Sequence, residues 1–206
     1  MARTPTIRTI VRFLRLTGLR LGFRLGAFLA PAATIRRAGA LFCTPLPGSR
    51  RVVEVPPNAS EGDLEVAGQR IHTYAWGDPH RQPYVLFAHG WSDQGARFAP
   101  WVARLRAEGY AVVAFDQAAH GRSSGERTTL PGFTETLLAV GRRFGPAAAV
   151  VGHSLGGAAT AVALAQGLQA QRVVLIAPAA DPVAAAQRFA RLIALPERLC
   201  RRMIAG

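Results

Sequence analysis

The stretch Ala147-Ala-Ala-Val-Val-Gly-His-Ser-Leu-Gly-Gly157 decides the fold of this 206-residue chain. Its apolar beginning, residues 147–151, predicts a short buried strand, and the Ala-rich segment 158–168 predicts a helix. Between them, residues 152–156 fit the pattern G-x-S-x-G, in which a serine stands on a sharp turn from a strand into a helix. The order of strand, turn and helix favours Ser154 as a nucleophile over a passive serine in a glycine-rich turn.

The glycines around Ser154 have a steric reason. Gly152 and Gly156 leave room for the strand and the helix to pass close together, and Gly157 lets the helix pack tightly on the sheet. The turn directs the backbone N–H of Leu155, at a helix N-terminus, toward the place where an oxyanion would form. Ser154 and Leu155 are therefore the first candidate catalytic residues.

A second apolar run, residues 84–88, predicts another buried strand, which ends at His89-Gly90-Trp91. Because Gly90 allows the backbone to turn sharply, we expect the N–H of Trp91 to face the same site and to supply a second oxyanion donor. We expect His89 to pack and hydrogen-bond within this turn.

The rest of the chain alternates between predicted strands and helices. Segments 64–66 and 71–76 predict a hairpin that turns at Gly68, with His72 and His80 at the surface or the edge. Further strands are expected at 110–115 and 172–177, and further helices at 97–108, 131–144 and 183–195. This alternation predicts an α/β fold with a mostly parallel sheet covered by helices on both faces. Ligands of such sheets bind at the carboxyl ends of the strands, where His89, Asp116, Ser154 and Asp181 fall.

The N-terminal quarter of the chain carries most of the formal net charge of +13. All basic residues are arginines, ten of them lie in residues 1–51, and the first acidic residue is Glu54. Apolar residues recur at helical spacing and predict an amphipathic basic helix of about 24 residues that ends before Pro31. The stripe consists of Ile7, Ile10, Val11, Leu14, Leu21, Leu25, Phe28 and Leu29, with Gly18 and Gly22.

Two interpretations of this helix stay open. It lies on an anionic membrane surface through residues 1–30, or it packs its stripe on the domain and leaves its arginines in water. A membrane span is disfavoured because Arg20 and Arg24 interrupt the apolar run, and a signal peptide because the lead before 25–33 is too long. No recognition fold or aromatic stacking pattern accompanies the charge, so we expect no nucleic-acid partner.

The two cysteines, Cys43 and Cys200, match no metal-binding spacing and no disulfide framework. We therefore expect neither a metal nor an organic cofactor, and a cytoplasmic protein, peripheral to a membrane if the basic helix binds one. The expected organisation is a basic arm at 1–51, a linker at 52–63, a core at 64–182 and the start of a lid at 183–206.

Three motifs together carry a resemblance to a known family. His89-Gly90-Trp91, the loop 116–123 and residues 152–157 come in the order and spacing of the α/β-hydrolase superfamily, and resemble its serine esterases and lipases. The resemblance covers about residues 64–182. It implies a hydrolase of carboxylic esters or thioesters in which Ser154 forms an acyl-enzyme while the Trp91 and Leu155 N–H groups hold the oxyanion.

The chain departs from the family's pattern in two places. Ala118 and Ala119 stand where the loop of the family has Pro and Gly. In the family a triad acid and a histidine follow the elbow, but no histidine follows His153. Asp181 is a candidate for the acid, at a position that also suits a turn and a helix N-cap, and in the family the histidine that matches His120 is structural.

We therefore expect a chain truncated inside its lid, with the C-terminal strands missing and the strand at 172–177 left as an exposed apolar edge. The alternative is a catalytically disabled hydrolase-like protein that acts as a membrane-surface or partner-binding module.

Overall fold

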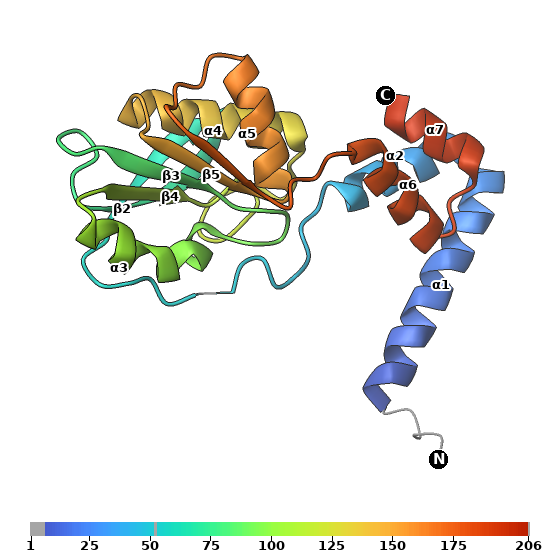
Figure 1. Ribbon diagram of the computed structural model, residues 1–206. Helices are drawn as coiled ribbons and strands as arrows, with labels where there is room; N and C mark the ends of the chain where they lie inside the picture. The colour runs from blue at the N-terminus through green and yellow to red at the C-terminus, as the bar shows by residue number, and fades with distance from the viewer. Residues whose placement is uncertain (1–6, 52, 206) are drawn as a thin grey trace. The chain divides into compact units, whose positions relative to one another are not determined.

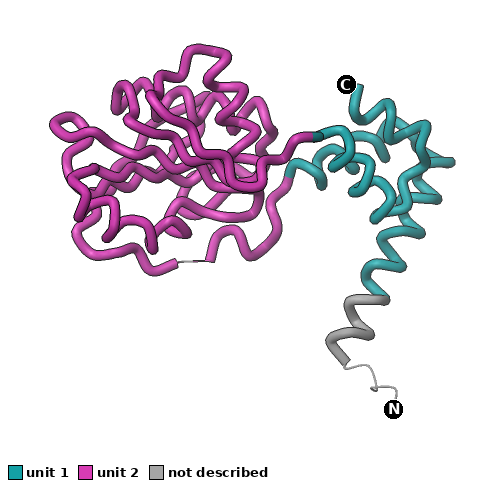
Figure 2. The backbone as a smooth tube through the Cα atoms, viewed as in Figure 1, with its two compact units in different colours: residues 1–43, 181–206 teal, residues 44–180 magenta. Residues whose placement is uncertain are grey.

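The computed structural model describes the backbone of residues 7–51 and 53–205, and within these the side chains from Leu14 onward. The chain divides into two compact units, which are described separately (Figure 2). Unit 1 comprises residues 1–43 and 181–206, and unit 2 comprises residues 44–180.

The described residues of unit 2 form a six-stranded sheet in the order β1-β2-β4-β3-β5-β6 (Figure 1). The strands are β1 (Ser60–Val66), β2 (Gln69–Trp76), β3 (Tyr84–Ala88), β4 (Ala111–Phe115), β5 (Ala149–His153) and β6 (Val173–Ile176). The helices are η1 (Gly95–Phe98), α3 (Ala99–Ala107), α4 (Leu130–Phe144) and α5 (Leu155–Ala165). β2 pairs antiparallel with β1 and β4, whereas β4, β3, β5 and β6 run parallel, which confirms the predicted mostly parallel sheet.

Helices cover both faces of this sheet, as predicted (Figure 1). On one face, Leu86 of β3 belongs to a core that includes Leu137 of α4 and residues of α5. On the other face, Phe87 packs with Phe98 of η1 and Val102 of α3. Successive side chains of β3 therefore point into different layers, and all five residues of the strand are buried.

The β1–β2 hairpin turns at Ala67 and Gly68, which have φ of 49° and 72°. Positive φ at both central residues is typical of a type I′ turn, whose twist matches the flanking strands. β1 begins at Ser60, four residues before the predicted start at Leu64. Its first residues are polar and exposed, so backbone pairing with β2, rather than an alternating apolar pattern, defines that part of the strand.

β6 is the edge of the described sheet, which confirms the expectation for residues 172–177. It pairs with β5 and with no other described strand. Val173, Val174 and Leu175 are each 40–47% exposed. This strand carries none of the charged side chains that commonly protect an edge.

The described residues of unit 1 form four helices: α1 (Ile7–Leu29), α2 (Pro31–Phe42), α6 (Pro182–Leu192) and α7 (Glu197–Ala205). Its core includes Phe23, Ala38, Ile193 and Leu199. α1 ends before Pro31, as predicted, but the same proline begins α2, because proline suits the first helical turn. No helix among the described residues is long and apolar enough to cross a membrane.

Candidate active site

Ser154 lies where β5 passes into α5, with its backbone in the left-handed half of the Ramachandran plot (φ 51°, ψ −120°). Such a conformation costs a non-glycine residue roughly 1–3 kcal/mol and persists only where the surroundings impose it. Here the Ser154 N–H donates to the carbonyl of Ile176 at 3.0 Å, and its own carbonyl accepts from the N–H groups of Gly157 and Ala179, both at 3.0 Å. Ser154 is half-buried, and no described residue hydrogen-bonds its hydroxyl.

The glycines of the turn are required for the reason given by the sequence. A Cβ on Gly156 would lie 2.3 Å from the carbonyl oxygen of His89, and one on Gly152 would lie 2.7 Å from Cα of Gly157. A Cβ on Gly90 would lie 2.9 Å from Cβ of Ser154. The turn after β3 and the turn after β5 therefore touch each other, and glycine permits the approach.

Trp91 lies on the turn that contacts Ser154, three residues after the end of β3 at Ala88. Neither its backbone N–H nor that of Leu155 donates a hydrogen bond to another described residue. Both N–H groups flank the Ser154 turn, which is the arrangement that an oxyanion hole needs. Their roles as oxyanion donors stay predictions.

His120 is the main support of the Trp91 turn. Its imidazole is fully buried, Nδ1 donates to the Ala118 carbonyl at 2.9 Å, and Nε2 accepts from the Ser92 N–H at 3.0 Å. Burial, assisted by the neighbouring His89, lowers the pKa of His120 to about 3, so the ring is neutral. Both ring nitrogens are thus committed to structural hydrogen bonds.

Phe133 of α4 completes this support, a role that the sequence reasoning missed. The Trp91 ring stacks on Phe133 with centroids 6.1 Å apart and meets the His120 ring edge-on at 5.3 Å. In the sequence Phe133 is one apolar residue of a helical pattern, with no signal that distinguishes it from other core positions. Only the packing of α4 brings it to the site.

His89 and Asp116 are fully buried and hold the loops rather than face substrate. His89 Nδ1 donates to the Gly90 carbonyl at 2.8 Å and Nε2 accepts from the Gln117 N–H at 2.9 Å, while burial lowers the pKa of His89. The Asp116 carboxylate accepts from the Tyr74 hydroxyl and from the backbone N–H groups of Gly95 and Arg122, each at 2.8 Å. The expectation that His89 hydrogen-bonds within its turn is confirmed.

His72 was expected at the surface or the edge, and this expectation is wrong. β2 lies inside the sheet between β1 and β4, so the His72 side chain is mostly covered. Its ring lies between two carboxylates, with Nδ1 2.8 Å from Asp63 and Nε2 3.2 Å from Glu61. His80, by contrast, is exposed as expected.

Asp181 begins α6 and belongs to unit 1, whereas Ser154 belongs to unit 2. Its Oδ1 accepts the N–H of Ala184 at 2.8 Å, which is an N-cap. The carboxylate thus has the capping role that the sequence offered as one of two. Its role as a triad acid stays a prediction.

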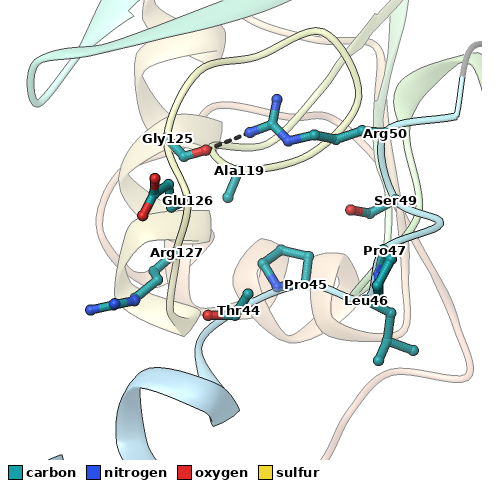
Figure 3. A pocket seen from close by; sticks show the side chains of 10 residues that line it. All are labelled: Thr44, Pro45, Leu46, Pro47, Ser49, Arg50, Ala119, Gly125, Glu126 and Arg127. Atoms are coloured by element: carbon teal, nitrogen blue, oxygen red, sulfur yellow. Dashed lines mark hydrogen bonds between the residues drawn. The ribbon is translucent and has the colours of Figure 1, made fainter. Parts of the chain in front are cut away.

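Two cavities lie near the loops of unit 2. One, of about 480 Å³, separates residues 44–50 from the loop that follows β4, and Arg50 donates to the Gly125 carbonyl across it (Figure 3). The other, of about 370 Å³, is lined by Trp91, Ser92 and Asp93 together with Arg51 and Arg97. Trp91 lines the second cavity and not the first, and Ser154 lines neither of the two. No three metal-ligating side chains gather among the described residues.

A family model described as "Alpha/beta hydrolase family" matches residues 85–204, which include the Trp91 turn and the Ser154 elbow. The chain belongs to the alpha/beta hydrolase family. The match spans more than half of the chain and agrees with the observed sheet order and strand-to-helix elbow.

Relatives of this alpha/beta hydrolase act on several kinds of bond. A monoacylglycerol lipase of Mycolicibacterium smegmatis is 34% identical over 102 residues, which are 45% of this chain and 36% of the lipase. The thioesterase domain from the curacin biosynthetic pathway superposes with a TM-score of 0.55 at 30% identity, covering 68% of this chain and 55% of that domain. Epoxide hydrolase A from Mycobacterium thermoresistibile has a TM-score of 0.51 at 25% identity, covering 57% and 38%. The chain thus spans about a third to a half of the length of these relatives.

Proposed function

We propose that this chain is a serine hydrolase of carboxylic esters or thioesters, with Ser154 as the nucleophile. The observation that carries the proposal is the strained Ser154 backbone, with φ of 51°, at a glycine-lined elbow between β5 and α5. A similar lipase and a similar thioesterase domain both act on acyl groups, as their names state, which supports an acyl substrate.

The proposed reaction has two steps. The Ser154 Oγ attacks the acyl carbonyl carbon and loses its proton to a base, while the carbonyl oxygen becomes an oxyanion held by the N–H groups of Trp91 and Leu155. Collapse of this intermediate breaks the bond to the departing oxygen or sulfur, which takes the proton back from the base and leaves as the alcohol or thiol, and an acyl-serine remains. Water then attacks the acyl-serine in the same way and releases the carboxylic acid.

The base is the unassigned part of this mechanism. His89 and His120 use both ring nitrogens in structural hydrogen bonds. The ring of His153 lies beside Gly90, with Nδ1 3.2 Å from the place of a Cβ on that residue, and does not hydrogen-bond Ser154. A serine with an oxyanion hole but no base retains only about 10³–10⁴-fold acceleration over water. We therefore propose that Ser154 and the two N–H donors form the nucleophile half of the site.

Labelling by a fluorophosphonate probe, read by intact mass, tests this proposal. The Ser154 oxygen bonds to phosphorus, fluoride leaves, and added imidazole takes the serine proton as the base. We expect imidazole to accelerate the addition of one phosphonyl group at Ser154. Ser154→Ala, which keeps the elbow backbone, must remain unlabelled while circular dichroism confirms that it is folded.

The alternative function is a catalytically disabled hydrolase scaffold that binds a membrane or a partner. The committed ring nitrogens of His89 and His120 favour it, because neither is free to activate Ser154. A folded wild-type chain that is not labelled, with or without imidazole, would refute the hydrolase and favour this alternative.

We propose further that the chain works at an anionic membrane surface. Unit 1 carries thirteen arginines against two carboxylates, Asp181 and Glu197, and so holds +11 of the total charge of +13. Such an excess is worth roughly 1 kcal/mol per arginine near an anionic bilayer. Co-sedimentation of the full chain with phosphatidylserine-containing vesicles, and not with phosphatidylcholine vesicles, is the expected result.

A further inference from the structure

α1 has two different apolar faces. Leu19, Phe23 and Ala27 face the core of unit 1, where they join residues of α2, α6 and α7. A second set, on the stripe that the sequence predicted, takes no part in this core and is 54–82% exposed. This set, called here the outer stripe, consists of Leu14, Leu21, Leu25, Phe28 and Leu29.

The two faces lie on opposite sides of the helix. At about 100° per residue, the outer stripe centres roughly 180° from the face that contains Leu19, Phe23 and Ala27. Because the inner face is fixed by its contacts, the outer stripe must point away from α2, α6 and α7. The first part of the predicted stripe, Ile7, Ile10 and Val11, lies outside the residues whose side chains are described.

Arginines border the outer stripe on both sides. At the same angular spacing, Arg15 follows one border and Arg20 and Arg24 follow the other. Neither α1 nor α2 contains an acidic residue. Among the described arginines of unit 1, only Arg201 forms an ion pair, with Glu197. The border of the stripe is therefore positive and not neutralised by neighbouring carboxylates.

An apolar stripe between two rows of arginines complements the boundary between phospholipid headgroups and acyl chains. Arginines attract anionic headgroups, and leucine and phenylalanine side chains enter the upper part of the acyl layer. A helix with one apolar stripe between charged borders binds in the plane of such an interface. A protein partner would have to supply both an apolar ridge and two acidic borders.

We propose that α1 is a two-faced anchor whose inner face holds unit 1 together and whose outer stripe inserts into an anionic membrane. This inference rests on the proposed membrane partner and specifies the surface that makes the contact. It assigns opposite roles to residues on the two faces of α1, since Phe23 stabilises the fold and Phe28 binds lipid.

A paired substitution separates insertion from charge. Leu25→Ser with Phe28→Ser keeps every arginine, and we expect its affinity for phosphatidylserine vesicles to fall roughly 100-fold. The matched control is Leu46→Ser with Val162→Ser, which removes exposed apolar side chains from unit 2 and should keep wild-type affinity. Circular dichroism and thermal melting must show both variants folded.

A tryptophan reporter measures the depth of insertion directly. All three native tryptophans, Trp76, Trp91 and Trp101, lie in unit 2, so Phe28→Trp adds the first one in unit 1. With vesicles whose acyl chains carry bromine, we expect fluorescence quenching of Phe28→Trp beyond that of wild type. The same quenching in both proteins would overturn the proposed insertion.

The possible failures are distinguishable. If the wild-type chain ignores anionic vesicles, the proposed membrane partner itself is wrong. If it binds and the Leu25/Phe28 variant binds equally well, the membrane partner stands and the outer stripe is not the contact. Two results would show that the outer stripe is covered by protein and would overturn the inference. One is a wild-type dimer that becomes a monomer in the Leu25/Phe28 variant. The other is a variant with lowered stability and unchanged vesicle binding.

Discussion

Mild acid should destabilise unit 2, because two buried histidines there resist protonation. His120 has its pKa lowered to about 3 by burial, and burial also lowers the pKa of His89. In the unfolded chain a histidine titrates near 6.5, so below that pH the unfolded state binds protons that the folded state does not. The stability supplied by these neutral rings is therefore complete above about pH 6.5 and is lost as the pH falls toward 3.

The magnitude follows from the pKa difference of His120. Each proton bound only by the unfolded state lowers the free energy of unfolding by about 1.36 kcal/mol per pH unit. Between pH 7 and pH 5, His120 alone should reduce the stability of unit 2 by about 2 kcal/mol, and His89 adds a loss of the same sign. In urea this corresponds to a fall of about 1 M in the unfolding midpoint.

Tryptophan fluorescence during urea unfolding is the appropriate assay. Trp91 contacts the His120 ring, and Trp76 and Trp101 also lie in unit 2, so the signal reports this unit. His120→Gln should unfold more readily at pH 7 but should lose about 2 kcal/mol of the pH dependence. The control His80→Gln removes an exposed imidazole from the same unit and should keep the wild-type slope. Equal slopes for His120→Gln and wild type would refute the assignment of a neutral buried ring.

Three further predictions concern the backbone and the sheet edge of unit 2. Ala67→Asn should raise the melting temperature by a few degrees, because alanine at φ 49° in an exposed hairpin turn costs roughly 1 kcal/mol more than asparagine. An unchanged melting temperature would contradict this strain at Ala67. Gly156→Ala should destabilise unit 2 by about 3 kcal/mol or more in urea unfolding, because its Cβ would meet backbone oxygens. The control Gly48→Ala should leave the stability unchanged, because no atom lies within 4 Å of its Cβ. Equal effects of the two substitutions would show that the elbow is not tightly packed. Val174→Lys on β6 should slow aggregation, measured by light scattering, and should change the free energy of unfolding by less than about 0.5 kcal/mol. Unaltered aggregation would mean that the chains do not associate through this edge.

The fold could be predicted where the residues of a short segment determine its structure by themselves. The run 84–88 is short, continuous and almost entirely apolar, which favours a strand buried on both faces. The glycines at 152, 156 and 157 predicted close contacts that the structure shows, because glycine is demanded by sterics that do not depend on distant residues. Such local signals placed the elbow and the Trp91 turn correctly.

Other features depend on partners that are distant in the sequence. α2 and α7 were not predicted, because short helices owe their stability mostly to the core that they share, here through Ala38 and Leu199. His72 was placed at an edge because the sequence does not reveal that β4 pairs on the far side of β2. Ala119 has a φ of 68°, a conformation that favours glycine, at the position where the family pattern has glycine.

The polar groups at the carboxyl edge of the sheet fall into two classes. The side chains of His89, Asp116 and His120 are fully buried and hydrogen-bonded to backbone groups of the loops, so the fold itself requires them. Ser154 is different, because its hydroxyl bonds no described residue while its backbone is held at a positive φ that glycine would adopt at lower cost. The proposed nucleophilic role accounts for a serine at this strained position, where the backbone conformation alone would favour glycine.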